Sequence, residues 1–331
     1  NIIVNTQQPP VNVTIDLAAF SPNGDGSKDV LGISPSVPVR SGLVSWKLSI
    51  LDSSRTERWS VSGTDPAGLP ARLAYDGRSS SGTVLPEGQY QAELTAIYSN
   101  GHNPKALSPL FTVDLTPPSG TVKADRTAFN PTGSAGQNKV VYSLTGSKEE
   151  AWKAVMAGAD GSAVRTWSMG PQPDAAVEWD GADDQGRPVP DGIYGLSISA
   201  TDRAGNSFQS APVSVSLDTE KKAVRVAADQ RAFSPNGDGQ KDTVKLTLSV
   251  LAKDKLKSFE LTVEDAESQA VVRSWKGTTG LADSYTWDGM AATAGTASSR
   301  APDGRYLARI KVTYQNGDAM EALTPAFVLD T

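Results

Sequence analysis

The chain lacks cysteine altogether and contains a single histidine, His102. Without a thiol it can form neither a disulfide nor a thiolate metal site, and one imidazole leaves zinc without its usual ligands. No apolar run approaches the roughly 20 residues that a membrane-spanning helix needs, so no membrane span is expected in this segment. The sequence begins at Asn1 rather than methionine and carries no secretory signal. We therefore expect it to be part of a longer polypeptide.

Strong charge of one sign is also absent. The net charge is −6 over 331 residues, and acidic and basic side chains are interspersed. Because there is no basic stripe, no nucleic-acid partner is expected. A phosphate-binding loop is not expected either, because the glycines at 24 and 26 lack the lysine and the following helix of a P-loop. The length suggests two or three domains, each large enough to bury its own core.

One pattern of residues recurs three times along the chain. Each copy opens with Asp-x-x-x-Phe, continues through a tryptophan, an aromatic-Asp-Gly element and a Pro-x-Gly-x-Tyr element, and closes with a β-rich run. These elements begin at 16, 59, 75 and 86 in the first copy, at 125, 167, 179 and 190 in the second, and at 229, 275, 287 and 302 in the third. The three tryptophans are spaced by 108 residues both times. The predicted domains are 10–116, 117–219 and 220–331, with 1–9 as an N-terminal strand or linker from a preceding region.

Within a copy, apolar residues alternate with polar ones, most clearly at Val244, Leu246, Leu248 and Val250. This period of two is typical of strands with one buried and one wet face, and Gly, Pro, Asn and Asp clusters mark the turns. About seven short strands in roughly 105 residues predict an immunoglobulin-like sandwich. The predicted fold is all-β, with three tandem immunoglobulin-like β-sandwich domains in an elongated array.

Three local predictions follow from the repeat. The repeated tryptophans are expected to anchor the cores, since no disulfide can. The tyrosine of each Pro-x-Gly-x-Tyr element is expected to form a tyrosine corner, with its hydroxyl tied to the preceding loop. Residues 148–157 have good helix propensity, but their alignment with Trp46 and Phe259 predicts a strand.

The linkers between copies are short. Residues 116–118 contain two prolines, which stiffen the joint, and residues 219–222 join the second and third copies. Because a strand of ten residues spans roughly 33 Å, three domains end to end would form a rod on the order of 100 Å long.

Two sequence elements resemble known bacterial modules. Residues 179–194, from Trp-Asp-Gly to Pro-Asp-Gly-Ile-Tyr, and the following Asp-Arg-Ala-Gly-Asn at 202–206 resemble the immunoglobulin-like domain of flagellar hook-capping (FlgD-type) proteins. The Phe-Ser-Pro-Asn-Gly-Asp-Gly elements at 20–26 and 233–239 resemble the start of the C-terminal domains of gliding-motility and surface proteins. The first copy departs from the module, with Tyr75 in place of tryptophan. The resemblance implies a fold and export to the cell surface, the outer membrane or the periplasm. It implies no activity.

The loops at 21–29 and 234–242 carry oxygen ligands at alternate or near-alternate positions. These are Asn23, Asp25 and Asp29 in the first copy and Asn236, Asp238 and Asp242 in the third. The pattern matches half of an EF-type loop in which the first and last ligands are missing. Asp16 and Asp229, four residues before each phenylalanine, are candidates to complete the shell. The functional interpretation is a Ca²⁺ site that stiffens a domain end.

The alternative interpretation of these loops is a hydrogen-bonded turn, in which the Asn and Asp side chains cap their own backbone. The equivalent segment of the second copy, 129–138, contains no carboxylate, which gives some support to the ligand interpretation. In a sandwich, a loop between the first two strands lies at the pole that faces the next domain. Calcium at 21–29 would therefore stiffen the joint near residues 116–118. Both interpretations stay open at this point.

No catalytic constellation is predicted. Asp76, Asp180, Asp288, Asp191 and Asp303 precede glycine at turn positions in every copy, where Asp-Gly serves hairpin geometry rather than glycoside hydrolysis. His102 lies at an expected loop tip without equivalents in the other copies, so a Ser–His–Asp triad is not expected. We expect a non-catalytic stalk, spacer or adhesin-like segment. The alternative is a module that binds carbohydrate or a protein ligand through polar loops at a domain pole.

Overall fold

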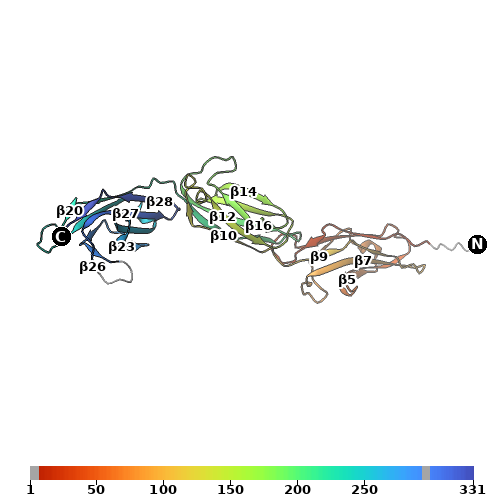
Figure 1. The fold of residues 1–331 in the computed structure, drawn as a ribbon. Helices are drawn as coiled ribbons and strands as arrows, with labels where there is room; N and C mark the ends of the chain where they lie inside the picture. The colour runs from red at the N-terminus through yellow and green to blue at the C-terminus, as the bar shows by residue number, and fades with distance from the viewer. Residues whose placement is uncertain (1–6, 293–298) are drawn as a thin grey trace, which may run out of the picture.

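A computed structural model describes residues 7–292 and 299–331. The chain forms three β-sandwich domains arranged in a line, with the first and third domains at opposite ends (Figure 1). Two short 3₁₀ turns, η1 (Pro66–Gly68) and η2 (Lys253–Lys255), are the helical elements of the described ranges. No helix in these ranges is long and apolar enough to cross a membrane. Of the predicted N-terminal strand or linker, 1–6 lie outside the described residues and 7–9 form no strand.

The first domain pairs a three-stranded sheet with a six-stranded sheet. The small sheet has the order β1 (Asn12–Ile15), β3 (Leu31–Ser36), β6 (Leu73–Tyr75). The large sheet has the order β2 (Ala19–Phe20), β9 (Phe111–Val113), β7 (Gly88–Tyr98), β4 (Leu43–Asp52), β5 (Glu57–Gly63), with β8 (Lys105–Leu107) also paired to β7. The β2–β9 pair is parallel, whereas the other pairs of this domain are antiparallel.

The second and third domains repeat this topology. In the second, β10 (Gly120–Ala124), β12 (Val140–Gly146) and β15 (Ala176–Trp179) form the small sheet. Its large sheet contains β11 (Ala128–Phe129), β18 (Val213–Leu217), β16 (Gly192–Thr201), β13 (Trp152–Gly158), β14 (Ala163–Met169) and β17 (Ser207–Gln209). In the third, the small sheet is β19 (Val224–Ala228), β21 (Val244–Val250) and β24 (Ser284–Trp287). Its large sheet contains β20 (Ala232–Phe233), β29 (Phe327–Leu329), β27 (Gly304–Tyr314), β22 (Leu256–Asp265), β23 (Val271–Gly277) and β28 (Ala319–Leu323), and β25 (Met290–Ala291) pairs with β26 (Ser299–Arg300). The all-β, three-domain prediction is confirmed.

Each domain has its own hydrophobic core, formed between its two sheets. The alternating strands turn their apolar residues inward: along β21, Val244, Leu246 and Leu248 are buried while the residues between them are exposed. Trp179 and Trp287 are fully buried at the ends of equivalent strands and pack against Phe129 and Phe233 at ring distances of 5.6 and 5.4 Å. Such aromatic pairs contribute about 0.5–1.5 kcal/mol beyond the area they bury.

The tyrosine corner is present in all three domains. The hydroxyls of Tyr90, Tyr194 and Tyr306 donate to the carbonyls of Pro86, Pro190 and Pro302 at 2.9, 2.7 and 2.6 Å. These bonds tie the start of the longest strand to the loop before it. Residues 148–157 also follow the prediction, because Trp152–Gly158 is strand β13 and Trp152 is buried like Trp46.

The three equally spaced tryptophans do not share one register. Trp167 pairs with Ala154, and Trp275 pairs with Leu261, each two residues beyond the aromatic that starts the facing strand. Trp59 pairs with Ile50, four residues beyond Trp46. Trp59 therefore sits one pleat nearer the hairpin bend. All three are half-buried against their cores rather than at the centre. Equal spacing along the chain concealed this shift, because it says nothing about position along the ladder.

Candidate functional site at the interdomain joints

The loop at 21–29 is closed by its own polar side chains. Asp29 accepts the main-chain N–H groups of Gly24 and Gly26 at 2.6 and 2.7 Å, one on each carboxylate oxygen. Asn23 Oδ1 accepts the N–H of Asp25 at 2.9 Å, and Asp25 Oδ1 accepts that of Ser27 at 2.8 Å. Asn23 also donates its amide to Asp25 Oδ2 at 3.0 Å. These side chains therefore hold the loop by Asx-type turns, as the second interpretation of the sequence predicted.

The twin loop at 234–242 has the same bonds. Asp242 accepts from Gly237 and Gly239 at 2.8 Å each. Asn236 accepts from the N–H of Asp238 at 3.0 Å and donates to its carboxylate at 3.2 Å. Asp238 in turn accepts from the N–H of residue 240 at 2.7 Å. Two loops far apart in the sequence thus share one conformation.

The remaining predicted ligands are occupied elsewhere. Asp16 Oδ1 accepts the N–H of Gly32 at 2.8 Å, and its Oδ2 pairs with Arg72 at 2.6 Å. Asp229 Oδ1 accepts the N–H of Lys245 at 2.9 Å. Across the described ranges, no group of three or more His, Cys, Asp or Glu residues is arranged to hold a metal ion. Calcium binding at these loops stays a prediction, and the bonds above account for the loop conformation without an ion.

The first loop lies at the joint with the second domain, at the pole where it was expected. Its partner is the hairpin turn at 202–206, between β16 and β17. Asn23 donates to Asn206 Oδ1 at 3.1 Å, Ser27 donates to the carbonyl of Gly205 at 3.2 Å, and Lys28 donates to that of Arg203 at 2.6 Å. The loop therefore holds the hairpin by three side-chain donors.

Asn206 also reaches the end of the first domain. Its amide donates to the main-chain carbonyl of Asp114, which follows β9, at 3.0 Å, and to the carboxylate of Asp202 at 2.8 Å. Asn206 is 1% exposed. One buried asparagine therefore joins the loop of the first domain, the exit of its last strand and the hairpin of the second domain.

The joint between the second and third domains has the same plan with different residues. Asn130 donates to the carboxylate of Asp318 at 3.1 Å, in the hairpin turn at 315–318 between β27 and β28. Asn316 donates to the main-chain carbonyl of Asp218 at 3.0 Å. Asp218 follows β18 as Asp114 follows β9. In both joints the first-strand loop of one domain and the exit of its last strand therefore contact one hairpin of the next.

A glycine lies at the tip of each hairpin, where the loop of the preceding domain touches it. A Cβ added to Gly205 would lie 2.7 Å from Ser27 Oγ, and one added to Gly317 would lie 2.6 Å from Gln137 Oε1. Both glycines have positive φ, +100° and +89°, so a side chain would be strained there as well. In the first domain, the equivalent Gly101 has φ +87° and nothing within 4 Å of an added Cβ.

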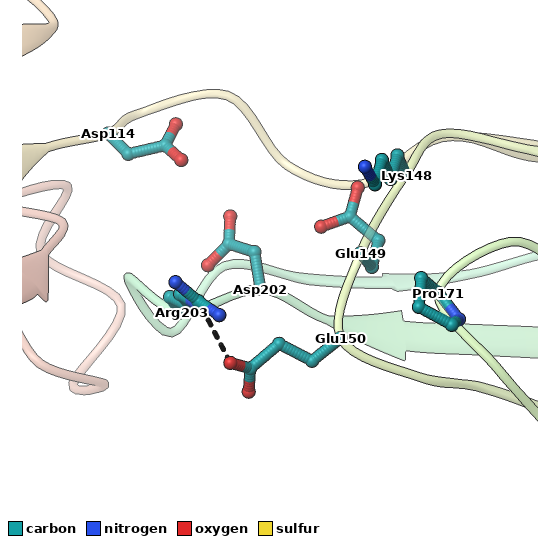
Figure 2. A pocket seen from close by; sticks show the side chains of 7 residues that line it. All are labelled: Asp114, Lys148, Glu149, Glu150, Pro171, Asp202 and Arg203. Atoms are coloured by element: carbon teal, nitrogen blue, oxygen red, sulfur yellow. Dashed lines mark hydrogen bonds and ion pairs between the residues drawn. The ribbon is translucent and has the colours of Figure 1, made fainter.

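An acidic cleft of about 590 Å³ opens beside the first joint. Figure 2 shows Asp114 of the first domain across from Asp202 of the second, with an ion pair between Arg203 and Glu150 at 2.6 Å. Burial raises the pKa of the Asp114 carboxyl, and the neighbouring carboxylates of Asp202 and Glu87 raise it further. The cleft therefore disfavours negative charge on Asp114.

The second joint has cations at the corresponding place. The Lys222 ammonium contacts Asp218 at 2.9 Å, and its side chain is 3% exposed. Lys255 of the third domain pairs with Asp218 at 3.2 Å and with Glu220 at 2.6 Å. Burial acts to raise the pKa of Asp218, but the hydrogen bonds from Lys222, Glu220 N–H and Lys255 outweigh it and lower that pKa. The Lys222 ammonium also lies 5.4 Å from the ring centre of Tyr314 in the third domain, within cation–π range.

The aspartates of the Asp-Gly elements have turn roles. Asp76, Asp180 and Asp288 each accept the N–H two residues ahead, at 3.1–3.3 Å. Asp191 and Asp303 accept the hydroxyls of Thr219 and Thr331 at 2.8 and 2.9 Å, just after the last strand of their domains. These two therefore fix the direction in which the chain leaves a domain, a role that the sequence reasoning missed.

His102 does not form part of a triad. It lies in the first domain's hairpin, and its Nδ1 is buried with no hydrogen-bond partner among the described residues. No carboxylate therefore orients the ring as a Ser–His–Asp triad requires.

The hairpins at 202–206 and 315–318 were also missed as site residues. In the sequence, Asp-Arg-Ala-Gly-Asn at 202–206 indicated only the family resemblance. The sequence signal that could have found them is a glycine at the same spacing from the corner tyrosine in every copy, at 101, 205 and 317.

The family model for the FlgD Ig-like domain matches residues 127–204. Over these residues the middle domain is similar to the FlgD Ig-like domain. The matched range contains the tyrosine corner of Tyr194 and runs into the joint hairpin at 202–206. The domain that carries this match is the one that both neighbouring domains contact.

Three solved structures are similar along most of the chain. A tetra-tandem repeat from the extending region of a large adhesion protein has 19% identity and a TM-score of 0.31, covering 97% of this chain and 74% of its own. A chain solved in a study of host cell surface retention of a 1.5-MDa bacterial ice-binding adhesin has 13% identity and a TM-score of 0.38, with 98% of this chain and 99% of that chain covered. The FN1–FN3 domains of chicken CNTN1 have 9% identity and a TM-score of 0.33, covering 97% and 99%. The comparison with curated proteins found no match.

Proposed function

We propose that this chain is a rod-forming structural segment of an exported bacterial protein, placed at the cell surface, at the outer membrane or in the periplasm. The observation that carries the proposal is the repeated construction of the joints. In each, a hydrogen-bonded loop and a strand exit of one domain hold a hairpin of the next. A string of domains with bonded joints can project or space whatever lies beyond its ends.

The joints use contacts that resist bending in more than one direction. Asn206 bonds the loop on one side and the Asp114 carbonyl on the other. A hydrogen bond of this kind contributes about 0.5–1.5 kcal/mol net, and each joint has several. Free domain motion is the default for a small interdomain contact. The shared asparagines therefore favour a stiff rod, on the order of 100 Å long from three domains of strand length.

The position of the FlgD-type sequence supports the exported setting. The family match at 127–204 falls on the middle domain, and the Ser-Pro-Asn-Gly-Asp-Gly loops resemble those of bacterial surface proteins. Protease shaving of intact cells and osmotic release of the periplasm test this setting. We expect the chain in the shaved or the released fraction. Retention in the cytosol would contradict the proposal.

The carbohydrate-binding alternative has no observation in its favour. All seven tryptophans are buried or half-buried against a core, so none is left fully exposed as a stacking platform for a sugar ring.

Stiffness is tested by distances across each joint. Ser62 on β5, Ser168 on β14 and Lys276 on β23 are exposed and occupy equivalent ladder positions. Because the chain has no cysteine, each pair of these residues can be replaced by cysteine and spin-labelled without background. The Ser62–Ser168 and Ser168–Lys276 pairs should each give one narrow distance distribution. Broad distance distributions for both pairs would show that the joints bend freely and would contradict the rod.

A further inference from the structure

The loop at 234–242 repeats the joint loop of the first domain almost residue for residue. Eight of its nine residues are the same as in 21–29, and the difference is Gln240 in place of Ser27. Its internal hydrogen bonds are the same. Its backbone is also the same, with Lys241 at φ 53° where Lys28 has 49°. The third domain therefore presents a formed copy of a loop whose twin holds a neighbouring domain.

In the third domain, the groups that would hold a neighbour are free. Lys28 donates to the second domain, but the Lys241 ammonium has no hydrogen bond or ion pair among the described residues. Asp330 follows β29 as Asp114 follows β9, and its N–H bonds the carbonyl of Phe233 in the same way. Figure 1 places β20 and the end of the chain together at the outer end of the third domain.

We propose that this surface, formed by the loop at 234–242 and the carbonyl of Asp330, is a docking site for a further Ig-like domain. The hairpin that it fits carries Asp-x-Ala-Gly-Asn, as residues 202–206 do. The inference rests on the joints of the proposed function and names the partner that extends them.

The occupied joint indicates which partner groups are needed. The hairpin asparagine must accept from the amide of Asn236 and donate to the carbonyl of Asp330, as Asn206 does for Asn23 and Asp114. Its tip must be glycine, because the loop side chain comes within contact distance. Gln240 is larger than Ser27, but Gln137 shows that a glutamine can pack on a tip glycine at the second joint.

The hairpins of the first and third domains fit this loop less well. In the first domain, His102 takes the position of Asn206, so no carboxamide is there to accept and donate together. The third domain's hairpin is bonded by Asn130, and the third domain's own loop has Ser234 at the position of Asn130. A second copy of this chain, docking by its first domain, is therefore the weaker occupant.

The test extends the chain by the domain that already uses this joint. Residues 1–330 are followed directly by a second copy of 115–219, so that Asp330 takes the place of Asp114. Spin labels at Lys276→Cys and at the appended Ser168→Cys report the new joint. The Ser62–Ser168 pair of the original chain reports the reference joint. We expect the two distance distributions to coincide in mean and width.

Two variants connect the distance to the proposed contacts. Lys241→Glu alters a side chain that makes no bond within its loop, and Gly205→Leu in the appended domain blocks the tip. Each should broaden the new distribution at least twofold. Lys245→Glu, on the exposed face of β21, is the matched charge control and should leave it unchanged.

The remaining outcomes overturn the inference. A broad distribution at the new joint with a narrow one at the reference joint would refute the docking site and leave the rod intact. If the distance distribution at the new joint stays narrow in both variants, the appended domain is held by contacts other than the proposed loop and hairpin. End-to-end growth of the original chain with concentration, seen by X-ray scattering and lost in Lys241→Glu, would assign the loop to a second copy instead. A broad distance distribution at the reference joint would contradict the proposed function itself.

Discussion

Asp114 and Asp218 end equivalent strands, and the main-chain carbonyl of each accepts an asparagine amide from the next domain at 3.0 Å. Their carboxylates, however, have opposite surroundings. Asp114 is partly buried near the carboxylates of Asp202 and Glu87, whereas Asp218 pairs with Lys222 and Lys255. The two joints thus share hydrogen bonds but differ in electrostatics.

This contrast predicts opposite pH dependences for the two domain junctions. Because folding lowers the pKa of Asp218, this carboxylate stabilises the folded protein at any pH above 3.8, the pKa in the unfolded chain. That stabilisation is lost as the pH falls from 3.8 through the lower folded pKa. The raised pKa of Asp114 acts in the other direction, because the folded protein binds its proton more tightly than the unfolded chain does. Lowering the pH toward 3.8 protonates Asp114 in the folded protein and therefore removes the cost of its buried charge. Carboxyl NMR titration of both residues checks the two directions, and a shared direction would contradict the prediction.

The matched substitutions at pH 7 should also diverge. Asp218→Asn leaves Lys222, 3% exposed, without its closest carboxylate, and breaking such a buried pair costs about 3 kcal/mol or more. Asp114→Asn removes a charge from an unfavourable place while its carbonyl still accepts from Asn206. We expect it to be neutral or stabilising. Calorimetric melts of the two variants at equal concentration measure the difference.

The tip glycines permit a second matched comparison. Gly205 and Gly101 both have positive φ, so alanine at either should cost roughly 1 kcal/mol from backbone strain. Gly205→Ala adds a contact with Ser27, whereas Gly101→Ala meets open space. We expect both to lower the melting temperature of their own domains. Only Gly205→Ala should broaden the Ser62–Ser168 distance distribution, and equal effects on that distance would argue against the close fit.

Two buried tyrosines of the middle domain should respond oppositely to loss of the hydroxyl. Tyr194 donates to Pro190 O at 2.7 Å, so Tyr194→Phe leaves an unpaired carbonyl and should cost about 1–2 kcal/mol. The Tyr142 hydroxyl is buried with no partner in the described part of the chain, so Tyr142→Phe should be neutral or stabilising. A loss of 1 kcal/mol lowers the melting temperature of a domain this size by about 4–8 °C. Calorimetry resolves that shift.

The sequence predicts the fold well because the repeats and the alternation of apolar and polar residues both indicate which side chains face the core. Turn aspartates, corner tyrosines and inward apolar residues recur in all three copies, and the structure places them as expected. Register is the weaker part. Trp59 kept its spacing from Trp167 but moved one pleat along the ladder, and a shift by two residues leaves the buried face unchanged. Patterning alone therefore cannot detect it.

The site was only half visible in the sequence. The loops at 21–29 and 234–242 stood out because their oxygens are local and closely spaced. Their partners did not, because Asn206 lies 183 residues from Asn23, and the motif at 202–206 indicated a family and not a contact. Contacts between domains depend on how consecutive sandwiches are stacked, which no periodicity within one domain encodes.

The last prediction separates the two interpretations of the loops. If Asp29 acts by accepting the N–H groups of Gly24 and Gly26, Asp29→Ala should lower the stability of the first domain by about 1–2 kcal/mol. The loss should be the same in EDTA as in millimolar calcium, and Asp242→Ala should behave alike in the third domain.

A calcium site predicts a different dependence on the ion. Wild-type stability would then rise with calcium as RT ln(1 + [Ca²⁺]/Kd), and Asp25→Ala, which keeps the Asp29 bonds, would abolish that rise. Because both oxygens of Asp29 already accept main-chain donors, an ion would have to displace them or bind beside them. We therefore expect the melting temperature of the wild type to be unchanged by calcium. A rise that Asp25→Ala removes would establish the metal site.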